Sequence, residues 1–533
     1  MNVPLTPLRF LRHAERQYPT RIAVVSQAKR FTYAQFADRV ARLAGTLREA
    51  GIRPGDRLAY IGVNSHRLLE AYYGVLEAEA ILVPLNIRLS PGELSFVLND
   101  CGATLLFVDP QFLPLVNSFR NQLQSVRIIC QLDGTIENDW VAHLLYDQLL
   151  EAAPRFQLDI ATVNEDDTAE IFYTSGTSAQ PKGVMLTHRN IYLHALETSH
   201  GFSVRNGAVE LHTIPLFHAN GWGIAHFLTM LGGKHVMVET FDPIAIFNFI
   251  QSESVNYFNA VPFMATVLAQ HPRLREFNLT SLERIVIGGA ASSPTLIREV
   301  EQAFGCRCFS GYGLTETSPA LTAAQPKPEL LWTDEQRYVG QSTTGYPFPC
   351  VEVRIVDAEE KLLPEDGIAV GELVTRSDGV MKGYWQQPEL TAEALRGGWF
   401  HTGDMASIDQ NGYVTVVDRK KDIIISGGEN ISSLEVEKAM LAHPAIFEVA
   451  VIPVSDARWG EVPKALVVLK PGAQATEAEL IEFGRSCLTH YKCPKTVVFV
   501  ESLPKTGTGK VLKKNLRAQY ETIPASHPPT VSS

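Results

Sequence analysis

Apolar and polar positions along the first three hundred residues predict strands and helices in alternation. Thr32 and Gln35 have the spacing of a capping box, and apolar residues follow them at helical spacing. Short apolar runs that predict strands lie at 57–62, 81–84 and 104–108, with helical patterns between them. The same alternation resumes over 169–309. Strands and helices that alternate at this spacing predict an α/β fold with mostly parallel sheets flanked by helices.

The pattern changes after about residue 339. Short apolar runs separated by Gly, Pro and Asp predict a compact β subdomain, at 351–356, 371–375 and 412–417. A charged stretch, 418–422, then precedes a small α+β pattern with capping signatures at Ser432 and Thr476. We therefore expect a large N-terminal domain over 1–417, a linking segment at 418–421, a small α+β C-terminal domain over 422–525 and a disordered tail over 526–533.

Length and charge narrow the class of protein. A chain of 533 residues is too long for one ordinary core, which agrees with two domains. Its formal charge of −11 argues against a general nucleic-acid or membrane-surface binder but allows a local basic patch for an anionic cofactor. Seven scattered cysteines without a CxxC pair predict no zinc site or disulfide framework and favour a reducing compartment.

The termini and the uncharged stretches predict a cytoplasmic protein. Arg9, Arg12 and Arg16 lie where a signal peptide would need an unbroken apolar run. The notable uncharged stretch, 211–233, contains three histidines and an asparagine, so we do not expect it to span a membrane. The sequence allows a homodimer but does not specify an oligomeric state.

The segment from Thr174 to Gly183 has the residue types of a phosphate-binding loop. Small residues allow backbone N–H groups to face an anion, and hydroxyls add donors. Its candidate ATP ligands are Thr174, Ser175, Gly176, Thr177 and Lys182, with the Thr177 hydroxyl also a candidate metal ligand. A polar surface loop is the plain alternative. A Walker P-loop is disfavoured, because Pro181 and Gly183 replace the second glycine and the hydroxyl residue of that motif.

The run TSGTSAQPKG resembles the phosphate loop of the adenylate-forming superfamily, which includes acyl-CoA synthetases, adenylation domains of peptide synthetases and beetle luciferases. The resemblance extends in order over about residues 10–517. Ala179 departs from it, since the family usually has glycine there and alanine is less free at positive φ.

The resemblance implies nucleotide contacts in several segments. In GYGLTET, Tyr312 would stack on adenine, Thr315 would contact the α-phosphate and Glu316 would bind Mg²⁺. Taken singly, the tyrosine would be read as core and the glutamate as a solvated charge. The other implied nucleotide ligands are Gly289 and Ala290 after a predicted strand, Asp404 in HTGD, and Arg419 in the charged stretch.

The same resemblance implies acyl and CoA contacts and a moving domain. His218 would lie near the reacting carboxyl, and the implied acyl- or CoA-binding residues are Trp222, Gly288, Gly313 and Gly428. The small domain would be mobile about Lys421, and Lys510 would be the catalytic lysine. Without the resemblance, a lone histidine, a tryptophan and a basic tail are more often structural.

The function implied is that of an AMP-forming acyl-CoA synthetase, with ATP, Mg²⁺, CoA and a short- to medium-chain fatty acid as cofactor and substrates. HANGWG, GGENISS, RWGE and HYKCPK resemble synthetases of this branch, which also includes methylthioalkanoate ligases. The alternatives are an aryl-CoA ligase, a fatty-acyl-AMP ligase that loads a carrier protein, a luciferase-like oxygenase and a nonenzymatic nucleotide-binding regulator. No nucleic-acid partner and no integral membrane association are expected.

Overall fold

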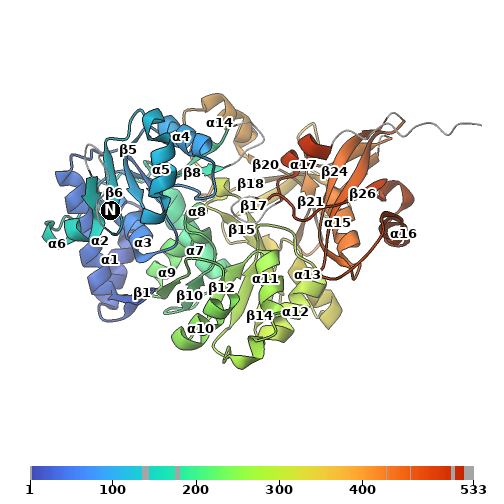
Figure 1. The fold of residues 1–533 in the computed structure, drawn as a ribbon, viewed down its shortest axis with the longest axis horizontal. Helices are drawn as coiled ribbons and strands as arrows, with labels where there is room; N and C mark the ends of the chain where they lie inside the picture. Colours follow the sequence, from blue (N-terminus) through green and yellow to red (C-terminus); the bar gives the residue numbers. More distant parts are fainter. Residues whose placement is uncertain are drawn as a thin grey trace, which may run out of the picture. The chain divides into compact units, whose positions relative to one another are not determined.

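The computed structural model describes residues 3–134, 143–174, 180–427, 429–456, 458–505 and 511–520. The chain divides into two compact units. Unit 1 comprises residues 1–353 and 375–400, and unit 2 comprises residues 354–374 and 401–533. Each unit therefore contains segments that are distant in the sequence. Figure 1 labels many of the helices and strands of both units.

An eight-stranded sheet in unit 1 has the order β19-β9-β8-β4-β3-β5-β6-β7. Its strands are β3 (Arg57–Ile61), β4 (Ile81–Pro84), β5 (Ala103–Val108), β6 (Ile128–Gln131), β7 (His143–Leu145), β8 (Thr168–Thr174), β9 (Lys182–Thr187) and β19 (Gly383–Tyr384). The strands from β8 to β7 in this order pair in parallel, whereas β9 pairs antiparallel with both β8 and β19. The returning segment 375–400 thus adds an edge strand beside the phosphate loop.

A nine-stranded sheet in unit 1 has the order β16-β15-β14-β13-β12-β10-β11-β1-β2. Its strands are β1 (Ile22–Ser26), β2 (Lys29–Thr32), β10 (Val209–His212), β11 (Lys234–Met237), β12 (Tyr257–Ala260), β13 (Arg284–Ile287), β14 (Arg307–Gly313), β15 (Ala320–Ala323) and β16 (Tyr346–Pro347). In this spatial order, the neighbouring strands from β14 to β1 pair in parallel. Among the described strands of this sheet, antiparallel pairs occur only at the two edges, where β15 pairs with β14 and β16, and β2 pairs with β1.

Helices cover both faces of these sheets. On β3, Leu58 and Tyr60 pack into one apolar cluster and Ala59 and Ile61 into another. Strands buried on both faces read as continuous apolar runs, which explains the pattern in the sequence. The helices of unit 1 are α1 (Leu8–Gln17), α2 (Tyr33–Glu49), α3 (His66–Glu77), α4 (Pro91–Asp100), α5 (Leu113–Phe119), α6 (Tyr146–Ala152), α7 (His188–Gly201), α8 (Ala219–Trp222), α9 (Ile224–Met230), α10 (Pro243–Glu253), α11 (Pro262–Ala269), α12 (Pro294–Phe304), α13 (Asp334–Ser342) and α14 (Pro388–Ala394).

Unit 2 contains most of a four-stranded sheet and all of a five-stranded sheet. The first has the order β17 (Glu352–Val356), β18 (Gly371–Arg376), β20 (Phe400–Ile408) and β21 (Val414–Arg419). The second consists of β22 (Ile424–Ser426), β23 (Glu429–Ile431), β24 (Ile446–Asp456), β25 (Gly460–Leu469) and β26 (Thr496–Phe499). Helices α15 (Ser433–Leu441) and α16 (Glu477–Cys487) pack on one apolar cluster of this sheet and α17 (Lys513–Tyr520) on another (Figure 1).

The predicted fold class is confirmed, and so are the helix starts that were expected from capping residues. Thr32 and Thr476 each form a complete capping box, and the Ser432 side chain accepts from the Glu435 N–H. Among the described helices, none is long and apolar enough to cross a membrane. The predicted linking segment 418–421 lies inside unit 2, so the proposal of a hinge there concerns motion and remains a prediction.

A buried histidine predicts how stability depends on pH. His194 on α7 accepts from the Ala320 N–H at 3.0 Å, and burial lowers its pKa from 6.5 to about 3. Below pH 6.5 the unfolded chain gains a proton there that the folded chain excludes, so the stability present above this pH is lost as the pH falls. The contribution is about 1.4 kcal/mol per pH unit.

The variant His194→Gln isolates this proton, because other groups titrate equally in both proteins. We expect the free energy of unfolding, measured with urea, to fall less steeply in the variant than in wild type between about pH 6.5 and 5. Equal slopes would contradict a neutral buried His194.

Candidate active site

The predicted phosphate loop lies in the sequence between β8 and β9, which are antiparallel neighbours. Thr174 and Lys182 are directly opposite partners across these antiparallel strands. The sequence between them is therefore anchored at both ends by strand pairing. Ser175, Gly176 and Thr177, which the sequence predicts as ATP ligands, lie outside the described residues.

One tyrosine connects the predicted phosphate lysine with the predicted magnesium ligand. Lys182 Nζ lies 5.3 Å from the centre of the Tyr384 ring. The Tyr384 hydroxyl donates to Glu316 Oε1 at 3.0 Å. Burial and the neighbouring Glu316 carboxylate raise the pKa of Tyr384, which keeps the hydroxyl protonated as a donor. Lys182 and Glu316, far apart in sequence, thus contact the same side chain of unit 1.

The GYGLTET motif forms the end of β14, a 3-10 turn and the start of the return to β15. Thr315 is buried in the turn and Tyr312 is half-buried on β14. A Cβ atom added to Gly313 would lie 1.7 Å from the Pro319 carbonyl oxygen. Two backbone segments therefore meet at Gly313, and this close approach fixes where Tyr312 and Thr315 lie.

The predicted acyl floor is assembled from three segments of chain. A Cβ added to Gly288, just after β13, would lie 3.0 Å from the Trp222 ring and 3.1 Å from the Gly311 carbonyl oxygen. Gly289 has φ +78°, and its added Cβ would lie 3.5 Å from the same ring. The side chain of Trp222 thus lies over the two glycines, and Ala290 follows them in an exposed position.

Trp222 reaches this position from a left-handed turn. Residues 219–223 all have positive φ, with values of 43°, 46°, 66°, 64° and 85°. His218 immediately precedes the turn and is half-buried. Three of the five residues are not glycine, and each such residue in a left-handed conformation costs about 1–2 kcal/mol. Strain of this kind persists where surrounding bonds enforce it, and it is common at functional sites.

Buried polar contacts hold the left-handed turn. Asn220 is 1% exposed, donates to Glu170 Oε2 at 2.9 Å and accepts from the Gly223 N–H at 2.7 Å. Glu170, on β8, is also within 2.7 Å of His226 Nε2. The strand that leads into the phosphate loop is therefore bonded directly to the turn that carries Trp222.

Unit 2 brings the two predicted ribose ligands together. Asp404 and Arg419 are opposite partners of β20 and β21, and Arg419 Nε lies 2.6 Å from Asp404 Oδ1. Lys421, the predicted pivot, occupies the turn after β21, where its carbonyl accepts from Arg517 at 3.1 Å. Gly428 and Lys510 lie outside the described residues.

The residues around Glu316 fit Mg²⁺ held mainly by a nucleotide. In the described part of the chain, no group of three or more His, Cys, Asp and Glu side chains could enclose a metal. Mg²⁺ is commonly bound by one or two carboxylates together with substrate phosphates. A single carboxylate whose other contact is a neutral tyrosine, beside a phosphate loop, agrees with that mode of binding.

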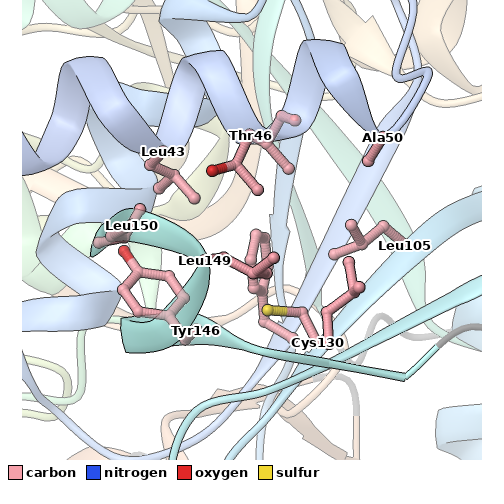
Figure 2. A pocket seen from close by; sticks show the side chains of 11 residues that line it. Leu43, Thr46, Ala50, Leu105, Cys130, Tyr146, Leu149 and Leu150 are labelled. Carbon is pink, nitrogen blue, oxygen red and sulfur yellow. The ribbon is translucent and has the colours of Figure 1, made fainter. Parts of the chain in front are cut away.

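A small apolar cavity in unit 1 is separate from these residues. It is lined by side chains of α2, β5, β6 and α6, among them Leu43, Leu105, Cys130 and Tyr146 (Figure 2). Its volume of about 10 Å³ is no more than one water requires. None of the predicted site residues lines it, so we assign it no ligand.

Sequence reasoning missed Tyr384 and the Asn220 contacts. Nothing around Gly383-Tyr384-Trp385 marks a site in the sequence, because Tyr384 reaches Glu316 only through pairing of β19 with β9. The Asn220-Gly221 dipeptide did carry a signal, since Asn-Gly favours positive φ.

The close approach at Gly313 gives a test of the site's geometry. Gly313→Ala should lower the melting temperature by several degrees, because overpacking costs about 1–3 kcal/mol and a backbone carbonyl cannot turn away. Gly92→Ala is the matched control, since no atom lies within 4 Å of its added Cβ. Thermal unfolding of both variants measures the effect, and equal melting temperatures would refute the packing described here.

Comparison with known proteins places the chain in a family. A family model described as AMP-binding enzyme matches residues 11–385, and one described as AMP-binding enzyme C-terminal domain matches residues 435–510. The chain is 37% identical to a feruloyl-CoA synthase of Amycolatopsis sp, over 95% of this chain and 97% of the relative. It is 36% identical to a long-chain-fatty-acid–CoA ligase of Thermus thermophilus, over 93% of this chain and 91% of the relative.

Solved structures agree over the same length. The anthranilate CoA ligase AuaEII, in complex with anthranoyl-AMP, superposes with a TM-score of 0.88 at 25% identity, over 97% of this chain and 98% of that one. ATP-bound MatB from Rhodopseudomonas palustris gives a TM-score of 0.84 at 28% identity, over 96% of this chain and 99% of the MatB chain. The resemblance seen in the phosphate loop is thereby confirmed, and the chain belongs to the AMP-binding enzyme family.

Proposed function

We propose that this protein is an ATP-dependent, AMP-forming acyl-CoA synthetase. The observation that carries the proposal is the contact of Lys182 and Glu316 with Tyr384, in a chain whose relatives over nearly full length are named CoA ligases. A cation and a carboxylate on one buried ring suit triphosphate and Mg²⁺ side by side. A nonenzymatic nucleotide binder would not need this arrangement at the phosphate end.

In the first half-reaction, a carboxylate oxygen of the acid attacks the α-phosphorus of ATP. The bond from that phosphorus to the pyrophosphate oxygen breaks, which gives acyl-AMP and pyrophosphate. We assign Lys182 to the leaving pyrophosphate, whose charge it would offset, and Thr315 and Lys510 to the α-phosphate, where charge grows in the transition state. Mg²⁺, when bound, would neutralise phosphate charge. Glu316 would hold it, while Tyr384 orients that carboxylate.

In the second half-reaction, the thiol sulfur of CoA attacks the acyl carbonyl. The bond from the acyl carbon to the AMP oxygen breaks, the thiol proton is lost, and acyl-CoA and AMP are released. We assign His218 to the reacting carboxyl, Tyr312 to adenine, the Asp404–Arg419 pair to ribose and Gly428 to the CoA arm. Rotation of a C-terminal domain of 422–525 about Lys421 would exchange Lys510 for the CoA-binding loop.

The acid we propose is a short- to medium-chain fatty acid. The benzo ring of Trp222, whose outer atoms lie against Gly288 and Gly289, provides apolar surface that suits an alkyl chain but also a ring. Named relatives act on both kinds, since they include a feruloyl-CoA synthase and a butyrate–CoA ligase of Arabidopsis thaliana. An aryl-CoA ligase is therefore the alternative, as is transfer of the acyl group to a carrier protein.

Mass spectrometry of reaction products tests the function. Purified protein is incubated with ATP, Mg²⁺, CoA and a panel of alkyl and aryl acids. Formation of acyl-CoA with AMP supports the proposal, and the preferred acid decides between the two substrate classes. Acyl-AMP that never becomes acyl-CoA would indicate a carrier-protein ligase, and no adenylate from any acid would contradict the proposal.

We also propose that the enzyme acts in the cytoplasm without nucleic-acid or integral membrane partners. The scattered cysteines and the charge of −11 support this. A homodimer is compatible with the sequence, and light scattering of the purified protein measures the oligomeric state.

The Tyr384–Glu316 hydrogen bond predicts a graded response to Mg²⁺. Glu316→Gln should raise the Mg²⁺ concentration needed for half-maximal adenylation, because an amide is a poorer ligand for a hard cation. Tyr384→Phe removes only the hydroxyl and should raise this Mg²⁺ concentration by a smaller factor. Pyrophosphate exchange at a series of Mg²⁺ concentrations measures both effects. An unchanged Mg²⁺ dependence of Glu316→Gln would exclude its role as a ligand.

The two halves of the reaction should respond oppositely to two substitutions. Lys510→Ala should abolish most ATP–pyrophosphate exchange while conversion of supplied acyl-AMP and CoA to acyl-CoA stays near wild type. Lys421→Pro should spare exchange and suppress thioester formation, because proline fixes φ at the pivot. Both half-reactions are run on each variant with the same acyl group. Parallel loss of both halves in a folded variant would refute the assigned role.

A further inference from the structure

We propose that Asn220, Glu170 and His226 are positioning residues for the acyl floor. They hold the turn 219–223 in its left-handed conformation and thereby set the place of the Trp222 ring over Gly288. This inference rests on the proposed function only in taking the acid to lie against that ring.

Local backbone bonds support the turn, among them one from the Gly223 N–H to the Ala219 carbonyl at 3.3 Å. Ala219 and Trp222 have φ values of 43° and 64°, which side chains with a Cβ rarely adopt. Left-handed residues normally occur singly rather than in runs. Side-chain bonds must therefore add to these backbone bonds to maintain the run, and Asn220 and its partners supply them.

Asn220 uses both ends of its amide within the core. Its Nδ2 donates to Glu170 Oε2 at 2.9 Å, and its Oδ1 accepts from the Gly223 N–H at 2.7 Å. Since only 1% of the residue is exposed, water cannot replace either bond. Asparagine also tolerates positive φ better than most residues. The amide thus joins the start and the end of the turn and fixes both to β8.

Glu170 extends this connection to the next helix. Its Oε1 lies 2.7 Å from His226 Nε2, on α9, directly after the turn. The imidazole is held edge to face by Tyr72 and Tyr73 of α3, each with its centre 5.6 Å away. The carboxylate is fully buried, so its position is fixed by these contacts. The contacts of Glu170 therefore join β8, the turn and α9.

Loss of these bonds would displace Trp222 rather than the residues assigned to the nucleotide. Its ring is close enough to Gly288 that an added Cβ would contact it at 3.0 Å. If the turn relaxes, the ring must shift along the glycines and change the room left for an acyl chain. Lys182, Tyr384 and Glu316 contact one another without the turn. Loss of Asn220 should therefore alter recognition of the acid while recognition of ATP is kept.

Tryptophan fluorescence tests the structural part without using activity. The emission of Trp222 is obtained by subtracting spectra of Trp222→Phe, in the wild-type chain and in Asn220→Ala. We expect the Trp222 emission to shift to longer wavelength and to be quenched more strongly by acrylamide in Asn220→Ala. If that variant does not fold, Asn220→Gly, which permits positive φ but removes both hydrogen bonds, replaces it. Unchanged emission would overturn the inference even if the enzyme is an acyl-CoA synthetase.

A charge exchange tests the functional part. Asn220→Asp places two carboxylates together and should raise the KM for the preferred acid about ten-fold, the loss expected for one hydrogen bond to a charged group, while the KM for ATP stays near wild type. Adding Glu170→Gln lets the amide donate to the new carboxylate and should restore the KM for the acid. Failure of this rescue, or a parallel rise in the KM for ATP, would overturn the positioning role.

Asn256→Ala is the matched control. Asn256 also makes two hydrogen bonds, accepting from the Val209 N–H at 3.0 Å and donating to the Ser281 carbonyl at 3.2 Å, and it has no contact with the turn. Asn256→Ala should lower the free energy of unfolding without changing the KM for the preferred acid or the Trp222 emission. A rise in that KM equal to the rise in the Asn220 variants would assign their effect to general destabilisation. Absence of activity in the wild type toward every acid would instead reject the proposed function, and the fluorescence result would still decide the structural claim.

Discussion

Burial of both faces of the parallel sheets confines the chemistry of unit 1 to the ends of its strands. Side chains along β13 alternate between two apolar clusters, so no polar ligand can be held there at low cost. At the carboxyl ends this constraint is relieved. The phosphate hairpin follows β8, the turn with Trp222 follows β10, and Gly288 follows β13. Ligands of open α/β sheets bind at such edges.

Two features then shape the site. Backbone segments approach each other closely, and a segment distant in the sequence contributes a side chain. Gly288 and Gly313 allow Trp222 and the Pro319 carbonyl to come within distances that any side chain would block. The chain leaves unit 1 after residue 353 and returns over 375–400, which delivers Tyr384 to Lys182 and Glu316. Tyr384 thus links the edge strand β19 with the predicted phosphate ligand Lys182 and the predicted magnesium ligand Glu316.

Much of this arrangement was predictable from local signals. Capping signatures gave the starts of α2, α15 and α16, and continuous apolar runs gave β3, β4 and β5. The pairing of Asp404 with Arg419 follows from a hairpin, but which residues face each other depends on register. Tyr384 and Glu170 could not be found this way, because their roles arise from contacts between segments remote in sequence. Residues 219–223 also form a left-handed turn, whose conformation depends on buried bonds to β8.

The central claim is that a carboxylate oxygen attacks the α-phosphorus of ATP. Acid labelled with ¹⁸O in its carboxyl group follows that oxygen through both half-reactions. If acyl-AMP forms and CoA then attacks the carbonyl carbon, one labelled oxygen must leave with the phosphate of AMP. Mass spectrometry of the purified AMP should therefore show a single ¹⁸O. Unlabelled AMP, or label in inorganic phosphate together with ADP, would contradict the account.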